Sequence, residues 1–349
     1  MNSTTIQNLL DQSREQDEHK SDYIAHPHNI QFDPACTMQI QSGGLFANGM
    51  TQLTPNDWAY RQMFQKLGTT VFGKGVNKTL PADYLFALRP DLRAHVLNDH
   101  LRNYPNGDWF VRAYDDTCRA VLSDRYAAIA NTELLNILNA VTTESNTPSA
   151  LTASSTVTPD SLNVRIIWKD VHRGDDRNGN GNWGIGVAIT NGETGQRRLR
   201  GLPLLQRHSC QNSIVGDGSV SGFEFTHRGS VQTKMIVVKS AMQEILPFAA
   251  EMLEKMIAAE GQVIPDFSDV LAGLAMQYGW DDNVTTSIAV GTEGYTTRAG
   301  LVNGITHAAK LYEDPDARMD MEILGGRILV ANDSIFGRAA YASQMAERA

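Results

Sequence analysis

Residues 183–215 read WGIGVAITNGETGQRRLRGLPLLQRHSCQNSIV and decide the class of fold. Two apolar runs flank a polar, glycine-containing segment at 191–195, a pattern typical of two strands joined by a turn. The second strand is rich in arginine, with Arg197, Arg198, Arg200 and Arg207. We therefore predict a pair of antiparallel strands whose second member is basic.

A long helix is predicted after these strands. From Val231 to about Glu260 apolar side chains recur at helical spacing, which indicates one buried face. Pro247 lies inside this helix and is expected to kink or divide it. Residues 162–168 favour a preceding strand, and 268–278 and 299–311 favour further helices. The predicted fold class is α+β, an antiparallel sheet backed by long helices, with a helical N-terminal region.

The N-terminal half contains helix signals and one hairpin. Helices are expected after Thr54, with a stop at Gly68, after Leu80, from Pro90 to Tyr104 and from Asn131, while 109–122 alternates like a hairpin. These signals divide the whole chain into four predicted segments. Residues 1–30 are a flexible N-terminal segment, and 31–145 are an N-terminal helical region with a hairpin. Residues 146–160 are a linker or long loop, and 161–349 are an α+β core with a basic strand–helix face and an acidic helical C-terminal part.

Charge is distributed unevenly along the chain. The whole sequence has a net charge of -9, yet residues 161–240 hold 11 Lys and Arg against 6 Asp and Glu, a local excess of +5. A basic middle between acidic ends favours an anion-binding face. The alternative is that these charges pair with the acidic segments around them.

Length and composition indicate whether the chain is globular, crosses a membrane or contains disulfides. The chain has 349 residues, of which 42% are hydrophobic, and no apolar run approaches the roughly 20 residues that span a bilayer. The polar N-terminus has no signal-peptide core. Three distant cysteines, Cys36, Cys118 and Cys210, form no CxxC pair and are expected to be buried thiols. A cytoplasmic protein without membrane contact is predicted.

Catalytic, metal and cofactor signatures are lacking in the sequence. A calcium loop starting at Asp175 or Asp176 would place Gly186 or Val187 at its twelfth position, where a glutamate is required. His208 and Cys210 have no second pair at zinc spacing. GxxxxGK[ST], GxSxG and HExxH do not occur, and no GxGxxG lies between a strand and a helix, where a phosphate-binding loop requires it. We therefore predict no catalytic residue, no metal and no cofactor, and a protein that is not an enzyme.

The basic residues of the middle third suit a polyanion. Guanidinium groups bind phosphate bidentately, and the N-terminus of the predicted long helix also favours anions. Aromatic residues near the basic ones offer faces on which unpaired bases could stack. They are Trp109, Tyr114, Tyr126, Trp168 and Trp183. The predicted nucleic-acid-binding residues are Arg197, Arg198, Arg200, Arg207, Arg228 and Lys234.

An ordered series of motifs resembles a known family. The segments are Arg119–Tyr126 (RAVLSDRY), Gly186–Gly195 (GVAITNGETG), Arg207–Asn212 (RHSCQN), His227–Gly229 (HRG) and Gly300–Ala308 (GLVNGITHA). In this order they are similar to the phage/plasmid-like protein family catalogued only as a domain of unknown function. The resemblance implies a phage or plasmid source and no settled activity. The hairpin, arginine-bearing strand and long helix also bear a distant, fold-level resemblance to Rad52-type single-strand annealing proteins.

The resulting hypothesis is a phage- or plasmid-type protein that binds single-stranded nucleic acid, anneals strands in recombination and forms a homo-oligomer. The alternative is a phage structural or assembly protein whose basic and acidic faces mate head-to-tail between subunits. A metal-dependent nuclease is a third reading, which would need carboxylates clustered by the fold. DNA or RNA preference, oligomeric state and pathway stay open at this stage.

Overall fold

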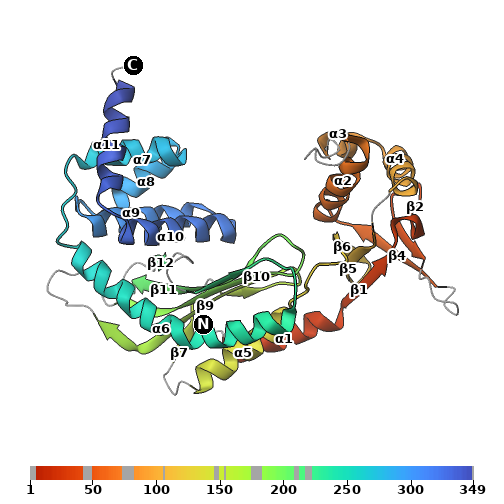
Figure 1. Cartoon of the computed structure of the whole chain (residues 1–349), viewed down its shortest axis with the longest axis horizontal. Helices are drawn as coiled ribbons and strands as arrows, with labels where there is room; N and C mark the ends of the chain where they lie inside the picture. Colours follow the sequence, from red (N-terminus) through yellow and green to blue (C-terminus); the bar gives the residue numbers. More distant parts are fainter. Residues whose placement is uncertain are drawn as a thin grey trace.

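The structure is a computed structural model in which two lobes rise from a shared base, as Figure 1 shows. It describes residues 5–41, 49–72, 82–104, 107–144, 149–152, 155–173, 183–207, 212–216 and 222–347. The first lobe contains one sheet with its helices. The second sheet and its helices form the base and the other lobe, so the chain is a mixed α+β protein, as the sequence predicts.

The first sheet has six strands in the order β1-β5-β6-β4-β3-β2. The strands are β1 (Lys20–Ala25), β2 (Ile30–Phe32), β3 (Met38–Gln41), β4 (Met50–Pro55), β5 (Trp109–Tyr114) and β6 (Thr117–Ser123). All neighbours are antiparallel except β4 and β6, which are parallel. Helices α2 (Asp57–Phe72), α3 (Ala82–Ala87) and α4 (Pro90–Arg102) supply apolar side chains to a core shared with the sheet. Met63, Phe64, Leu97, Trp109 and Val111 lie in this core.

The second sheet has seven strands, with the path β12-β11-β10-β9-β7 and with β13 on β11 and β8 on β9. Its strands are β7 (Ser149–Leu151), β8 (Thr156–Val157), β9 (Ser161–Arg173), β10 (Trp183–Gly192), β11 (Leu199–Arg207), β12 (Ser213–Val215) and β13 (Phe223–Phe225). Every residue of β10 is buried, because both faces of the sheet are covered. Gly186 permits the close approach of β9, since a Cβ there would lie 1.9 Å from the carbonyl oxygen of Ile166.

Helices cover both faces of this second sheet. Helices α1 (Ile6–Glu18), α5 (Asn131–Glu144) and α6 (Val231–Ala259) pack on one face, where Leu135, Val164 and Val238 share a core. Helix α10 (Pro315–Val330) packs on the other face through Met319 and Ile323. The C-terminal helices α7 (Phe267–Tyr278), α8 (Asp282–Gly291), α9 (Arg298–Ala308) and α11 (Ser334–Glu347) complete the second lobe. Two short 3-10 turns, η1 (Pro27–Asn29) and η3 (Ala309–Leu311), join neighbouring elements.

Several predicted elements are confirmed. The 109–122 hairpin is β5 and β6, the two strands of 183–215 are β10 and β11, and the predicted long helix is α6. Helix α6 begins at Ser230, whose Oγ accepts a hydrogen bond from the backbone N–H of Thr233 at 3.3 Å. It continues through Pro247 as one helix, so the proline does not divide it.

Other predicted boundaries need correction. Residues 1–30 were expected to be flexible, but from residue 6 they form α1, β1 and η1, because Leu9 and Leu10 of α1 are buried and β1 pairs with the distant β5. The 146–160 linker contributes β7 and β8 to the second sheet. Helix α2 passes Gly68 and ends at Phe72. The N-terminal region is also less helical than predicted, since it holds a complete six-stranded sheet.

Candidate functional site at the junction of the lobes

Four of the six predicted binding residues form ion pairs within the chain. Arg197 Nε lies 2.6 Å from Asp316 Oδ2, and Arg200 lies 3.3 Å from Glu224 and 3.4 Å from Asp320. Arg198 also pairs with Glu224. Arg207 is buried and lies 3.0 Å from Glu293. The basic strand β11 and the segment before it are therefore largely neutralised by nearby carboxylates.

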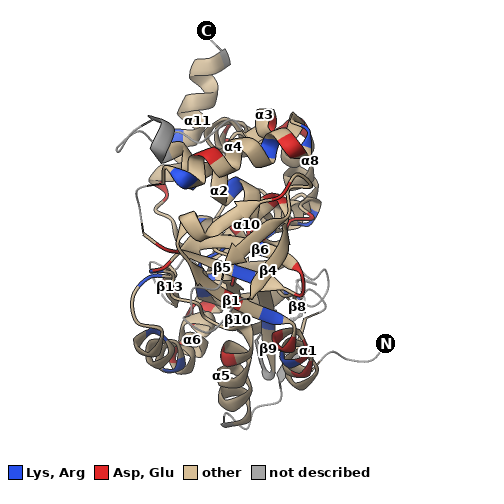
Figure 2. Ribbon diagram, turned by 90° about the vertical axis from the view of Figure 1, so that its right-hand side faces the viewer, with Lys and Arg blue, Asp and Glu red and all other residues tan. Residues whose placement is uncertain are grey.

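The acidic partners are held in place by the fold. Asp316 and Asp320 belong to the first turns of α10, whose Met319 and Ile323 pack on the second sheet and bring the carboxylates over β11. Burial raises the pKa of Asp316, although Arg197 opposes this shift. Figure 2 likewise shows basic and acidic residues interspersed along the visible ribbon. For Arg197, Arg198, Arg200 and Arg207 the structure therefore agrees with the alternative given above, in which the basic charges pair with acidic segments, and these residues do not form an unpaired anion-binding face.

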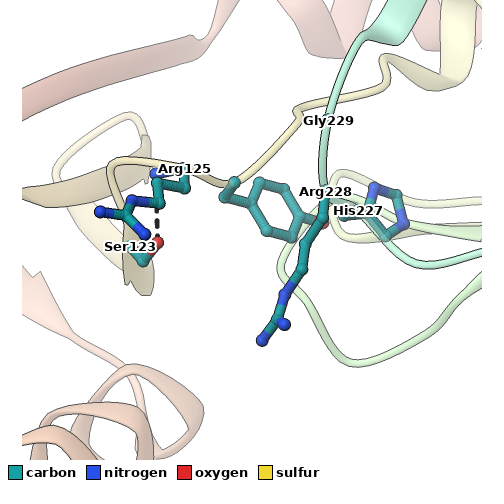
Figure 3. A pocket seen from close by; sticks show the side chains of 6 residues that line it. Ser123, Arg125, His227, Arg228 and Gly229 are labelled. Atoms are coloured by element: carbon teal, nitrogen blue, oxygen red, sulfur yellow. Dashed lines mark hydrogen bonds between the residues drawn. The ribbon is translucent and has the colours of Figure 1, made fainter.

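The other two predicted residues lie at a different place. Arg228 and the preceding His227 line a hollow of about 560 Å³, together with Ser123, Arg125, Tyr126 and Gly229. Figure 3 shows that Arg125 comes from the segment after β6, whereas Arg228 comes from the segment that leads into α6. Lys234, one turn into α6, donates a hydrogen bond to the carbonyl oxygen of Arg228. We call this pocket the junction hollow.

Backbone contacts fix the two sides of the junction hollow to each other. Tyr126 and Arg228 form an antiparallel bridge, and the N–H of Ala127 donates to the carbonyl of His227 at 3.0 Å. The Tyr126 ring stacks on His227 with a centroid separation of 4.9 Å, and its hydroxyl donates to the carbonyl of Gly192 at 2.8 Å. The hollow therefore lies between the segment that begins at the end of β6 and the segment that joins β13 to α6, and these contacts hold the two segments together.

The junction hollow carries two guanidinium groups that pair with no carboxylate among the described residues. Arg125 and Arg228 are both exposed, and within the described residues neither guanidinium has a carboxylate partner. The N-terminus of the 29-residue helix α6 lies directly after Gly229 and adds its partial positive charge. Two unpaired guanidinium groups beside a helix N-terminus form an environment that favours an anion such as phosphate.

His227 makes the stability of this region depend on pH. Its Nδ1 lies 3.2 Å from the carbonyl oxygen of Ala127, and burial lowers the pKa of the ring. Its contribution to stability is therefore fully present above the unfolded-state pKa of about 6.5 and is lost as pH falls through the lower folded-state value.

We expect unfolding free energies measured from pH 7.5 to pH 5.0 to fall more steeply for the wild-type protein than for His227→Gln. The comparison removes the opposite effect of His19, whose pKa is raised by a hydrogen bond with Asp115. Parallel pH curves for the two proteins would contradict the assignment.

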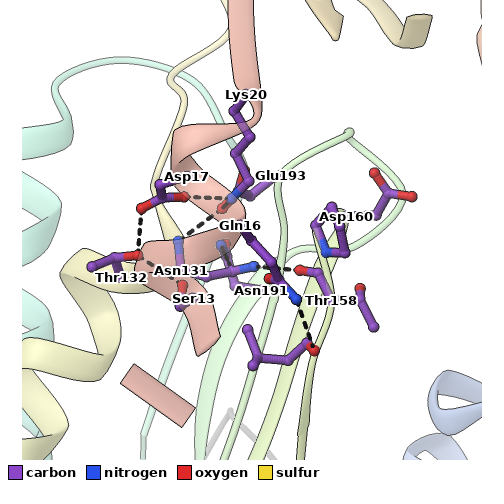
Figure 4. A network of polar contacts seen from close by, with 12 residues as sticks. Ser13, Gln16, Asp17, Lys20, Asn131, Thr132, Thr158, Asp160, Asn191 and Glu193 are labelled. Atoms are coloured by element: carbon purple, nitrogen blue, oxygen red, sulfur yellow. Dashed lines mark hydrogen bonds and ion pairs between the residues drawn. The ribbon is translucent and has the colours of Figure 1, made fainter. Parts of the chain in front are cut away.

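A buried ionic network lies next to Tyr126, whose hydroxyl donates to the carbonyl of Gly192, and Figure 4 shows part of this network. Its centre is Glu193, in the turn between β10 and β11. The Glu193 carboxylate accepts from Lys20 Nζ at 2.8 Å, from Arg119 Nη2 at 3.1 Å and from the backbone N–H of Asn131 at 2.9 Å. Arg112 Nη1 lies 3.5 Å from it. This network joins the second sheet to β1, β5 and β6 of the first.

Three of the segments that carry the family resemblance meet at this junction. One wall of the hollow comes from Arg119–Tyr126 and the other from His227–Gly229. The network takes the cation Arg119 from the first of these segments and Glu193 from the end of Gly186–Gly195. The sequence placed Tyr126 among possible stacking residues and Arg228 among binding residues, but it missed Arg125. The signal for Arg125 was its position inside the quoted RAVLSDRY segment.

Metal ligation and membrane insertion find no support in the part of the chain that the structure describes. No group of three or more His, Cys, Asp or Glu side chains there could hold a metal ion. No helix there has both the length and the apolar character needed to cross a membrane. Cys36 and Cys118 are buried thiols, as predicted, and burial raises the pKa of Cys118 to about 12. His208, Cys210, Asp175 and Asp176 lie outside the described residues.

Comparisons of the chain with protein-family models, with curated proteins and with solved structures find no match.

Proposed function

We propose that this protein binds single-stranded nucleic acid and that the junction hollow holds its phosphates. The observation that carries the proposal is the pair of exposed guanidinium groups, Arg125 and Arg228, that line one preformed hollow without carboxylate partners among the described residues. The start of α6 adds a favourable potential, and Lys234 lies one turn further on. Strand annealing and assembly into a homo-oligomer are the finer parts of this proposal.

The proposal gives a structural role, not a phosphate-binding one, to four of the predicted binding residues: Arg197, Arg198, Arg200 and Arg207. Their ion pairs with Asp316, Glu224, Asp320 and Glu293 would have to break before they could bind phosphate. They instead tie the acidic helix α10 and the loop after α8 to the second sheet. The phosphate contacts therefore fall on Arg125 and Arg228.

Removing the Arg228 side chain should weaken the binding of single-stranded oligonucleotides whatever their base sequence. We expect Arg228→Gln to lower the affinity for a fluorescent single-stranded oligonucleotide and to reduce the slope of log affinity against log salt by about one, because one phosphate contact is lost. The double variant Arg125→Gln/Arg228→Gln should reduce that slope by about two. Fluorescence anisotropy across a salt series measures both quantities.

The matched control is Arg198→Gln. The Arg198 side chain is 58% exposed, and its guanidinium is paired with Glu224. Arg198→Gln therefore removes one positive charge, as Arg228→Gln does, but from an arginine that already has a carboxylate partner. It should bind the oligonucleotide almost as the wild type does. Equal losses in Arg198→Gln and Arg228→Gln would move the site back to β11, and wild-type protein that binds no oligonucleotide at low salt would overturn the function itself.

The alternative, a phage assembly protein with mating charged faces, predicts another outcome. The intrachain ion pairs of β11 already use several of the charges that would join neighbouring subunits. Light scattering with and without oligonucleotide separates the two functions. Assembly that ignores the oligonucleotide and persists in Arg125→Gln/Arg228→Gln favours the assembly protein.

A further inference from the structure

The first sheet has one face turned away from its helices. Alternate residues of a strand point to opposite faces. On β5, Trp109 and Val111 enter the core with α2 and α4, so Phe110 points to the other face. The strand register places Ile24 of β1 on one side of Phe110 and Leu122 of β6 on the other. Ile24, Phe110 and Leu122 therefore share the face that lies away from the helices.

The turn between β10 and β11 covers only part of this face. A Cβ on Gly195 would lie 2.8 Å from Leu122, and Glu193 binds Arg112 and Arg119 of the same sheet. Among the described residues beyond the turn, Ile24 is 60% exposed and Phe110 is only partly buried. The Arg112 guanidinium lies 5.5 Å from the Phe110 ring centroid, over one side of the ring.

The open part continues into the junction hollow. The Phe110 and Tyr126 ring centroids are 6.3 Å apart with an interplanar angle of 31°, and Tyr126 in turn stacks on His227. Ile24, Phe110 and Tyr126 thus form a row from the edge strand β1 to the hollow, which we call the aromatic strip. Its far end is apolar and its near end borders Arg125.

We propose that the aromatic strip receives the unpaired bases of the strand whose phosphates lie on Arg125 and Arg228. This inference rests on the proposed function and adds the surface that the bases contact. Aromatic rings such as Phe110 and Tyr126 beside a positively charged hollow suit single-stranded nucleic acid, since every base has a face that can stack. Bases inside a duplex are already stacked on each other, so a duplex offers the strip nothing to bind. The charge next to the strip selects a polyanion over an uncharged apolar partner.

The test compares ligands with and without bases. We would measure anisotropy for a single-stranded oligonucleotide, an abasic oligonucleotide of equal length and the corresponding duplex, with inorganic polyphosphate as a competitor. Phe110→Ala should weaken the single strand by about tenfold or more, the effect of one lost base–aromatic stack. It should leave the abasic strand and polyphosphate unchanged. Phe110→Leu removes the ring but keeps an apolar side chain, and thermal unfolding of both variants shows whether the substitution has weakened the packing of the protein.

A second variant avoids the core altogether. Ile24→Ser replaces an exposed side chain on the edge strand without changing charge, and it should weaken the single strand but not polyphosphate while the protein folds as before. If Phe110→Ala and Ile24→Ser bind the single strand like the wild type while Arg228→Gln reduces binding, the strip does not hold bases but the proposed function stands. If wild-type protein binds neither oligonucleotide nor polyphosphate, the proposed function fails first. A duplex bound as tightly as the single strand, or strip variants that change only self-association, would also overturn the inference.

Discussion

Glu193→Ala is expected to destabilise the protein by about 3–5 kcal/mol, a large part of the roughly 5–15 kcal/mol that holds an ordinary domain folded. The Glu193 side chain is 1% exposed, and its carboxylate faces Lys20, Arg112 and Arg119, which are themselves buried or nearly so. Removing the carboxylate leaves several cations close together without their shared anion. It also leaves the backbone N–H of Asn131 without its acceptor.

Urea unfolding followed by circular dichroism measures this change. Glu193→Gln keeps the shape and one acceptor oxygen, so its stability should fall between that of the wild type and that of Glu193→Ala. Glu244→Ala is the control, because Glu244 is an exposed residue of α6 and its loss should change stability by no more than about 0.5 kcal/mol. A loss below about 1 kcal/mol in Glu193→Ala would mean that water reaches the network and replaces the carboxylate.

The same variant tests how the lobes are joined. Glu193 comes from the second sheet, whereas Lys20, Arg112 and Arg119 come from β1, β5 and β6 of the first. The junction hollow lies beside this network and takes residues from both sides. A weakened junction should therefore also reduce oligonucleotide binding at temperatures well below unfolding, although neither Arg125 nor Arg228 has been changed.

Local patterns in the sequence were sufficient for the long elements. Helix α6 repeats its buried residues Met235, Val238 and Met242 at helical spacing, and β10 and β11 are apolar runs on either side of a glycine-containing turn. These signals lie within one element and need no knowledge of its neighbours. Strands β2 and β3 have only three and four residues, so no periodicity could develop in them.

The charge pairs could not be predicted in the same way. The sequence shows that 161–240 is basic and the C-terminal third acidic, but the partners Arg197 and Asp316 lie 119 positions apart. Only the packing of Met319 and Ile323 on the second sheet brings α10 over β11. Arg125 and Arg228 are likewise distant in sequence, and they meet because Tyr126 and Arg228 form a backbone bridge. Long-range contacts of this kind decide which arginines stay unpaired.

The second large effect is expected at the ion pair between Arg165 of β9 and Glu322 of α10. Both side chains are 1% exposed, and the two groups approach in a bidentate manner with separations of 2.8 Å and 2.6 Å. Arg318 of α10 also lies 3.3 Å from the Glu322 carboxylate, and Met319 and Ile323 of the same helix are buried. Glu322→Ala should cost about 3–5 kcal/mol of stability, because the Arg165 guanidinium then stays buried without its anion.

Replacing both partners should have the opposite outcome. Arg165→Met together with Glu322→Leu removes both buried charges and fills the space with apolar atoms, so its stability should equal or exceed that of the wild type by up to about 4 kcal/mol. The exposed pair Arg198 and Glu224 gives the comparison, since breaking it with Glu224→Gln should cost no more than about 1 kcal/mol. Thermal and urea unfolding of these variants measures each change in the free energy of unfolding. If the double variant is as unstable as Glu322→Ala, the pair contributes through hydrogen-bond geometry that methionine and leucine cannot replace. The attachment of α10 would then depend on the charges themselves, and with it the position of the carboxylates that neutralise β11.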